Sequence, residues 1–115
     1  MAFSLTADRV VDAFLRAADR GVQVRGVVEA ERAGNLGSDV GRLRTAGLDV
    51  RLDTNPDTMH NKAIIIDRRA VLTGSYNFTQ SAEEHNDENL VIIDNPDLAG
   101  QYERAFQQLF DVALP

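Results

Sequence analysis

Residues 60–77 read HNKAIIIDRRAVLTGSYN, and this stretch gives the clearest indication of the fold. Its residues 63–66 are all apolar, which is typical of a strand that is buried on both faces of a sheet. Residues 68–69 form a short polar link to a further apolar segment at 70–73. The stretch therefore predicts two consecutive strands joined by a tight turn.

Apolar spacing on both sides of this stretch predicts further strands and helices. We expect strands at 2–5, 22–28, 48–52, 61–67, 70–73 and 90–93, the last again apolar on both faces, and helices at 7–20, from 38 to about 46, and from 95 onward. Thr6 and Ser38 are expected to cap the first two helices, residues 29–37 to form a loop, and residues near 80–84 to form a helical turn. The order of elements predicts one α/β domain over residues 1–115, with a mixed β-sheet flanked by helices on both faces.

Composition is that of an ordinary globular domain. The 115 residues are 43% hydrophobic and 26% charged, which argues against disorder. The absence of cysteine excludes disulfides, thiolate zinc sites and cysteine nucleophiles. There is no signal-peptide pattern at Met1 and no apolar run near the roughly 18 residues that a membrane span needs, so we expect a cytoplasmic protein by default.

The charge balance limits how the chain can bind anions. Its formal net charge is −6, and its twelve basic residues are scattered. A broad basic surface for nucleic acid is therefore missing, and any anion site must be local. The fold could still gather some of the arginines into a patch, the candidates being Arg42, Arg44, Arg51, Arg68 and Arg69.

His60 and Lys62 form the first pair of residues that could take part in a reaction, and Lys62 is the only lysine in the chain. Residues two apart in a strand project from the same face, so one imidazole and one ammonium could address the same phosphate. The imidazole can attack or pass a proton, while the ammonium supplies a fixed positive charge. Taken alone, the pair is better interpreted as an ordinary surface histidine and lysine at a strand entry.

The spacing beyond this pair favours the chemical interpretation. His60 and Lys62 are followed after four residues by Asp67, and after six more by Gly74-Ser75-Tyr76-Asn77. This pattern resembles the HxK(x)4D(x)6GSxN motif of the phospholipase D superfamily, with every fixed position present. Glu88, just before the last expected strand, matches a later acidic position of that family. The resemblance covers nearly the whole chain and implies a phospholipase D-like half-domain.

Within that superfamily the chain is most similar to the single-motif branch, which includes Nuc-type endonucleases and mitochondrial cardiolipin hydrolase-like proteins. The resemblance implies that two motif copies meet at one active site, supplied by a homodimer or by two halves of a longer chain. Relatives usually begin with an extra strand and helix before the segment matched by residues 2–5. Two interpretations stay open: a chain truncated at its N-terminus, or the second half of a two-motif protein.

The resemblance also implies roles for the motif residues. His60 would attack phosphorus and form a phosphohistidine, while His60 of a second copy protonates the leaving group. Lys62, Ser75 and Asn77 would bind the phosphate oxygens, and Glu88 would accept a hydrogen bond from the Nδ1–H of His60. The two histidines would titrate as a coupled pair and give a bell-shaped rate profile.

Three other residues are interpreted without a role in the reaction. Asp67 and Gly74 are expected to be structural, with Asp67 anchoring the turn at 68–69. His85 is expected to be an exposed loop residue, although a metal site built from residues 83–87 is an alternative. The mechanism that the resemblance implies needs no metal and no cofactor, so activity should persist in a chelator.

The preferred function is therefore a metal-independent phosphodiesterase, most similar to a Nuc-like nuclease acting on nucleic acid. One alternative is a phospholipid-cleaving hydrolase or transphosphatidylase of the phospholipase D type. Another is a non-catalytic module that has kept the fold for dimerisation or anion binding.

Overall fold

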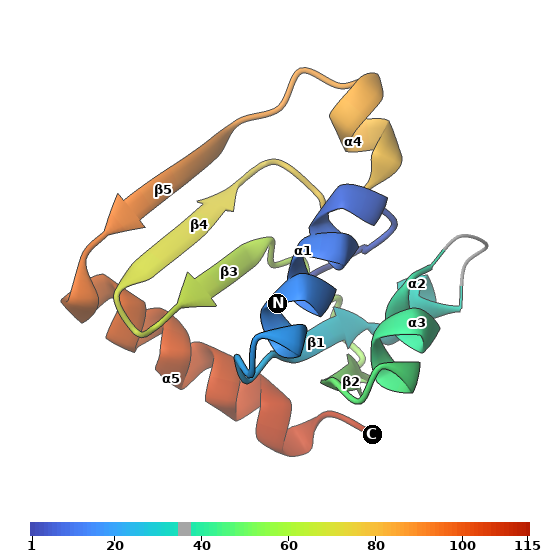
Figure 1. The fold of residues 1–115 in the computed structure, drawn as a ribbon, viewed down its shortest axis with the longest axis horizontal. Helices are drawn as coiled ribbons and strands as arrows, with labels where there is room; N and C mark the ends of the chain where they lie inside the picture. The colour runs from blue at the N-terminus through green and yellow to red at the C-terminus, as the bar shows by residue number, and fades with distance from the viewer. Residues whose placement is uncertain (35–37) are drawn as a thin grey trace.

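The computed structural model describes residues 1–34 and 38–115 as a mixed α/β domain with helices on both sides of the strands (Figure 1). The strands are β1 (Arg25–Glu29), β2 (Asp49–Asp53), β3 (Ala63–Ile66), β4 (Ala70–Gly74) and β5 (Leu90–Asp94). The helices are α1 (Asp8–Asp19), α2 (Ala30–Ala33), α3 (Val40–Thr45), α4 (Gln80–Glu84) and α5 (Pro96–Val112). The expected loop at 29–37 is wrong at its start, where α2 forms, and its residues 35–37 lie outside the described part of the chain.

The strands form two sheets, and the first residues of the chain join them. Strands β1 and β2 are parallel, whereas β3, β4 and β5 form an antiparallel sheet in that order. Ala2 bridges both sheets, because it pairs in parallel with Val28 of β1 and antiparallel with Lys62 just before β3. The strand expected at 2–5 is therefore replaced by isolated bridges at Ala2 and Leu5, since only short pieces of this segment run alongside a neighbour.

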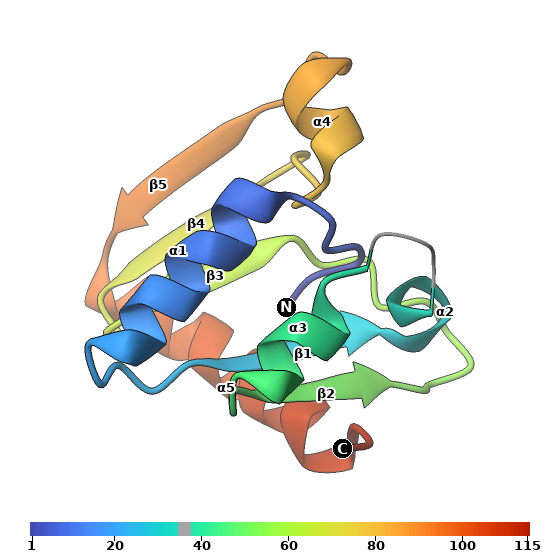
Figure 2. The same ribbon diagram turned by 45° about the vertical axis from the view of Figure 1, so that its right-hand side comes forward.

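Apolar residues from successive positions of the strands enter two separate cores. Val28 packs with Val11 of α1 and Leu43 of α3 on one face. Val27, its neighbour in β1, packs with Phe106 and Phe110 of α5 on the other face. Figure 2 accordingly shows α1 and α3 on one side of the strands and α5 on the other.

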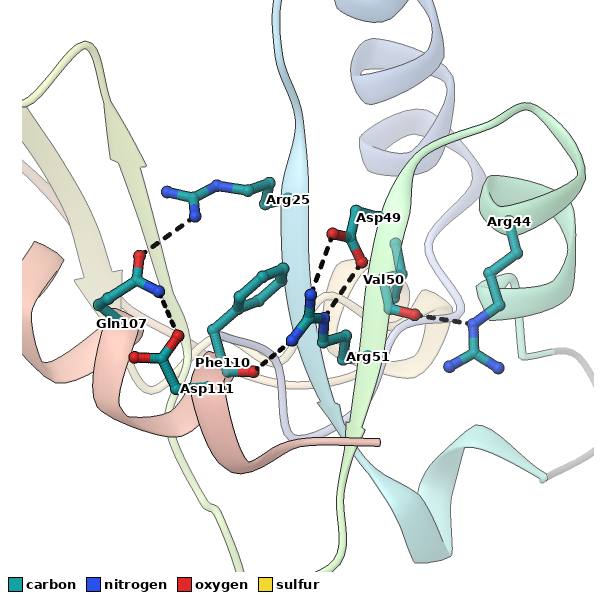
Figure 3. Close-up of polar contacts among 8 residues, drawn as sticks. All are labelled: Arg25, Arg44, Asp49, Val50, Arg51, Gln107, Phe110 and Asp111. Atoms are coloured by element: carbon teal, nitrogen blue, oxygen red, sulfur yellow. Dashed lines mark hydrogen bonds and ion pairs between the residues drawn. The ribbon is translucent and has the colours of Figure 1, made fainter. Parts of the chain in front are cut away.

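Arginines strengthen the contact between α5 and the parallel pair (Figure 3). Arg25 donates to Gln107 Oε1 at 3.2 Å, and Arg51 donates to the Phe110 carbonyl oxygen at 3.0 Å. The guanidinium carbon of Arg51 also lies 3.9 Å from the centre of the Phe110 ring. These two arginines are therefore part of the packing between helix and sheet.

Strand β5 differs from its expected two-sided burial. It forms the edge of the antiparallel sheet, and Val91 and Ile92 are 49% and 70% exposed. Because an edge strand has a neighbour on one side only, an apolar sequence does not ensure burial. The same limit applies at the end of β3, where Ile66 is exposed.

The expected helix caps are also wrong. Helix α1 has Ala7 at its N-cap and α3 has Asp39, and neither makes a side-chain capping hydrogen bond. The Thr6 hydroxyl instead accepts from the backbone N–H of Gln80, which links α1 to α4. In the part of the chain that the structure describes, no helix has both the length and the apolar character needed to cross a membrane.

Candidate active site

His60 and Lys62 lie together at the start of β3. The Lys62 Nζ donates to the His60 carbonyl oxygen at 2.9 Å and lies 3.1 Å from Nδ1 and 3.3 Å from Nε2 of its ring. A lysine ammonium has donors only, so a ring nitrogen that it bonds must carry the free electron pair. His60 is exposed, which leaves the imidazole accessible to a ligand.

The backbone around His60 is held by residues distant in sequence. Phe3 donates its backbone N–H to the Asn61 carbonyl oxygen at 2.9 Å, and its ring lies edge-on to the His60 ring with centroids 4.5 Å apart. On the other side, the buried Glu29 at the end of β1 accepts from the backbone N–H of Met59 at 2.7 Å. These contacts fix the position from which the imidazole projects.

The Gly74-Ser75 pair lies beside this histidine–lysine pair because of the strand register. Ala63 pairs with Thr73 and Gly74 pairs with Leu90, so the start of β3, the end of β4 and the start of β5 share one end of the sheet. The Thr73 hydroxyl also donates to the Lys62 carbonyl oxygen at 3.1 Å.

Glycine is required at position 74 by a close approach of the backbone. A Cβ there would lie 2.3 Å from the Asn89 carbonyl oxygen and 2.6 Å from its Oδ1. The same carbonyl oxygen accepts from the backbone N–H groups of Ser75 and Tyr76 at 3.1 and 3.2 Å. Gly74 therefore allows the chain segment before β5 to dock on the turn that carries Ser75.

Glu88 lies in this docked segment and bonds Ser75 rather than His60. Its carboxylate accepts from the Ser75 hydroxyl and, at 3.1 Å, from Asn86 Nδ2. These two hydrogen bonds, chiefly the one from Ser75, lower the pKa of Glu88, and the positive charge of Lys62 acts in the same direction. The predicted hydrogen bond between His60 and Glu88 is absent among these described residues, because Lys62 lies against the ring nitrogens and Ser75 holds the carboxylate.

Lys62 is also influenced by this carboxylate. Burial lowers the pKa of the Lys62 ammonium from its ordinary value, while the negative charge of Glu88 raises it. The structure thus gathers His60, Lys62, Ser75 and Glu88 into one electrostatically connected group.

Asn77 and Tyr76 complete this end of the sheet. The Asn77 side chain has no hydrogen bond within the described ranges 1–34 and 38–115, and its Oδ1 is buried. No described residue therefore competes with a ligand for the amide group of Asn77. Tyr76 donates to Glu83 at 2.6 Å, and burial together with this bond raises the pKa of Tyr76 to about 12. A cavity of about 280 Å³ lies alongside, lined by Val10, Tyr76, Glu83, Glu88, Asn89 and Leu90.

The remaining predicted residues lie away from this group. Asp67 and Arg68 form the turn between β3 and β4 with φ of 52° and 53°, a conformation that aspartate tolerates better than most residues. His85 is exposed at the end of α4, with Nε2 3.8 Å from the Glu84 carboxylate. The residues described contain no group of three or more His, Cys, Asp or Glu side chains placed to hold a metal ion, so the alternative metal site at 83–87 has no geometric support.

Sequence reasoning missed two residues that adjoin the site, Glu29 and Arg32, whereas Phe3 was one of the aromatic residues expected to be able to line a site. Arg32 belongs to α2, and its guanidinium carbon lies 4.8 Å from the centre of the Phe3 ring. Glu29 gave the only available signal, since it is a charged residue at the end of an apolar strand. Nothing in the sequence alone indicated that residues 29 and 32 lie beside His60.

Comparison with known proteins places this site in a family. The family described as cardiolipin synthase, PLD-like domain, matches residues 1–110. Mitochondrial cardiolipin hydrolase of Chlamydomonas reinhardtii is 36% identical over 110 residues, which cover 96% of this chain and 49% of that protein. Phospholipase D of Rickettsia prowazekii (strain Madrid E) is 39% identical over 101 residues, covering 88% of this chain and 49% of its own length.

A solved structure agrees with these matches. Nuc from Salmonella typhimurium, a phospholipase D family member, superposes with a TM-score of 0.94 at 34% identity and covers 98% of this chain and 76% of its own. The chain spans about half the length of the curated relatives that it matches. The family match over residues 1–110, the identities and the shared fold together show that this chain belongs to the phospholipase D superfamily.

Proposed function

We propose that this chain supplies one motif copy of a phosphodiesterase that works through a phosphohistidine. The observation that carries the proposal is the contact between the exposed His60 ring and the Lys62 ammonium, 3.1 Å from Nδ1. A nucleophile and a fixed positive charge at this separation suit attack on a phosphate, because the ammonium stabilises the charge that grows on the non-bridging oxygens.

In the first step, the Lys62 ammonium turns from the His60 ring to the phosphate oxygens, and the freed electron pair of the imidazole forms a bond to phosphorus. The bond between phosphorus and the leaving oxygen breaks, and this oxygen takes a proton from the imidazolium of a second motif copy. Lys62 and the Asn77 amide bind the non-bridging oxygens of the phosphate. Ser75, whose hydroxyl is held by Glu88, lies beside them as a further phosphate-binding residue. One imidazole cannot attack phosphorus and protonate the opposite side, so the second copy is required.

In the second step, water attacks the phosphorus of the phosphohistidine. The now neutral imidazole of the second copy accepts the proton of this water, the nitrogen–phosphorus bond breaks, and His60 recovers its electron pair. Both histidines return to their starting states. Because side-chain cations carry the electrostatic stabilisation, we expect turnover to continue in EDTA.

The second copy is proposed to be an identical chain or a second motif in a longer protein. The first arrangement requires a dimer whose two His60 residues face each other across one phosphate. Solution scattering or sizing of the active protein measures this directly. A strictly monomeric chain with full activity would contradict the paired-histidine mechanism.

Nucleic acid is the preferred substrate. It is favoured by the resemblance of residues 60–77 to Nuc-type endonucleases and by the close superposition on Nuc. Phospholipid is the second candidate, favoured by the cavity beside Glu88, whose lining includes Val10, Tyr76 and Leu90. Two relatives are named cardiolipin hydrolase and phospholipase D.

The decisive experiment compares the two histidines of the chain. His60→Asn should reduce hydrolysis of bis-p-nitrophenyl phosphate by at least about 10²-fold, because it removes the nucleophile. His85→Asn is the matched control, since His85 is exposed at the end of α4, and it should retain full activity. Denaturing the wild-type protein during turnover should trap a phosphoenzyme that His60→Asn lacks. Retained activity in His60→Asn would overturn the proposal and favour a non-catalytic module.

A further inference from the structure

We propose that Arg32 forms a second phosphate subsite beside His60, which holds the phosphate next to the scissile one on a nucleic-acid strand. The inference rests on the proposed function and adds a residue that lies outside the motif. Arg32 would act as a substrate-positioning residue, so it should affect binding of substrates with two phosphates more than the chemical step.

The Phe3 ring links Arg32 to the catalytic pair. The Arg32 guanidinium carbon is 4.8 Å from the ring centre, the Lys62 Nζ is 5.3 Å from it, and the His60 ring centre is 4.5 Å from it. The distance from the Arg32 guanidinium carbon to the centre of the His60 ring is therefore at most the sum of the 4.8 Å and 4.5 Å distances. This span corresponds to a few nucleotides at most, since each nucleotide adds about 3.4 Å along the axis of a helical strand.

The charge of Arg32 is available to a ligand, whereas most arginines of the chain are ion-paired. Among residues 1–34 and 38–115, six arginines form ion pairs with Asp or Glu: Arg9, Arg25, Arg42, Arg51, Arg68 and Arg69. Arg32 is exposed and makes neither an ion pair nor a side-chain hydrogen bond with any residue in the described ranges. The basic patch suggested by the sequence, from Arg42 to Arg69, is largely consumed by such pairs.

A phosphate is the ligand that best suits this arrangement. A guanidinium presents a planar fork of donors that matches two oxygens of one phosphate, and a ring beneath it limits its motion without neutralising it. Lys62 and Arg32 lie on the same ring, so they place two positive charges where consecutive phosphates of one strand would pass. A protein with a net charge of −6 would then recognise nucleic acid through this local pair.

The test compares two substrates that differ by one phosphate. A dinucleoside monophosphate contains only the scissile diester. The second substrate is the same dinucleotide with an added terminal phosphate, and separate assays place this phosphate at the 5′ end or at the 3′ end. Arg32→Gln should raise KM for one of the two terminally phosphorylated forms roughly tenfold, because one charged contact is lost. The kcat for this substrate should stay within about twofold of the wild-type value. KM for the dinucleoside monophosphate should stay within about twofold. Arg32→Lys should restore part of the lost affinity, because it keeps the charge without the fork.

Arg104→Gln is the matched control, because Arg104 is an exposed arginine of α5 that forms no ion pair with a described residue. In a His60→Asn background, the affinity for single-stranded nucleic acid is measured at several salt concentrations. Arg32→Gln should make the slope of log K against log[salt] shallower by about 0.7, the value for one lost phosphate contact, and Arg104→Gln should leave this slope unchanged. Equal effects on both dinucleotide types, or equal effects of the two arginine variants, would overturn the inference. An effect confined to phospholipids with two phosphates would overturn the assignment to nucleic acid. A wild-type protein that cleaves no diester would instead contradict the proposed function.

Discussion

Two cationic side chains pack on the ring of Phe110 and two on the ring of Phe3, but the two pairs of cations differ in their surroundings. At Phe110 the guanidinium carbons of Arg25 and Arg51 lie 5.1 and 3.9 Å from the ring centre. At Phe3 the Arg32 guanidinium and the Lys62 ammonium lie at 4.8 and 5.3 Å. The ring contact is similar in the two clusters, so it does not by itself tell a structural arginine from one that binds a ligand.

The partners of the cations make the difference. Around Phe110, Arg25 bonds Glu103 and Gln107, and Arg51 bonds Asp49 and a backbone carbonyl, as Figure 3 shows for three of these four contacts. Around Phe3, no carboxylate in the described part of the chain bonds either cation, and a histidine faces the ring instead. Charges that are already satisfied stabilise the fold, and those left unsatisfied can act on a substrate.

The comparison predicts the largest effect on stability at Phe110. Phe110→Ala should lower the free energy of unfolding by about 3–5 kcal/mol, because the ring is buried under α5 and supports two arginines. Phe3→Ala should cost less than half of that, since its ring is half-exposed. Urea unfolding of both variants measures this. A larger loss for Phe3→Ala would show that the Phe3 cluster is structural too.

Among the four cations beside Phe3 and Phe110, the largest effect on activity is expected at Lys62. Lys62→Met should reduce kcat/KM by about 10²–10³-fold, the usual cost of removing one group that stabilises transition-state charge. Its circular dichroism and unfolding midpoint should remain close to those of the wild type. Arg51→Met should keep its activity. A Lys62→Met protein with wild-type turnover would contradict the conclusion that the cations beside Phe3 act on the substrate.

Smaller effects on stability should separate Arg51 from Arg32. Arg51→Met should cost about 1–2 kcal/mol, because it loses its contact with the Phe110 ring and its bond to the Phe110 carbonyl oxygen. Arg32→Met should change stability by less than about 0.5 kcal/mol, as expected of an exposed side chain that bonds no polar group of the described residues. Thermal unfolding of the two variants at equal ionic strength checks the order. Equal losses would mean that both arginines serve packing.

The last prediction concerns pH, because Lys62 can lose its charge in an accessible range and arginine cannot. Burial lowers the Lys62 pKa, so its ammonium should deprotonate below pH 10.5 and activity should fall there. The unfolded state binds this proton more tightly, so the Lys62 contribution to stability should rise as pH increases through the same window. As the only lysine, it gives one side-chain resonance after ¹³C reductive methylation. An ordinary or raised pKa would contradict the effect of burial, and Lys62→Arg should remove this alkaline loss.

Much of the fold followed from local patterns. The apolar stretch at 63–66 and the segment at 70–73 form the hairpin β3–β4, and the apolar spacing after Pro96 forms α5. The mixed α/β architecture with helices on both faces is confirmed by the structure and by its superposition on Nuc. These patterns act over a few residues, so they can be recognised without knowing the neighbours.

The errors concern features that depend on neighbours. Thr6 and Ser38 have the chemistry of helix caps, but both N-caps lie one residue later, at Ala7 and Asp39, whose backbone N–H groups donate to carbonyl oxygens distant in sequence. Strand β5 has the sequence of a buried strand and lies at an edge. The bond expected between Glu88 and His60 is replaced by one to Ser75, a choice that depends on how the segment before β5 docks at Gly74.

The sequence by itself determined which chemistry is present: a histidine, a lysine, a serine and an asparagine at fixed spacing, and an acidic residue farther along. Only the tertiary structure decided which distant residues adjoin them, because residues 1–3 must insert between β1 and β3 before Phe3 can touch His60 and Arg32. Spacing along a chain fixes local geometry, whereas contacts between distant segments depend on strand order and packing. The net charge of −6 therefore says little about the positive charges of Lys62 and Arg32, which no carboxylate in the described part of the chain pairs.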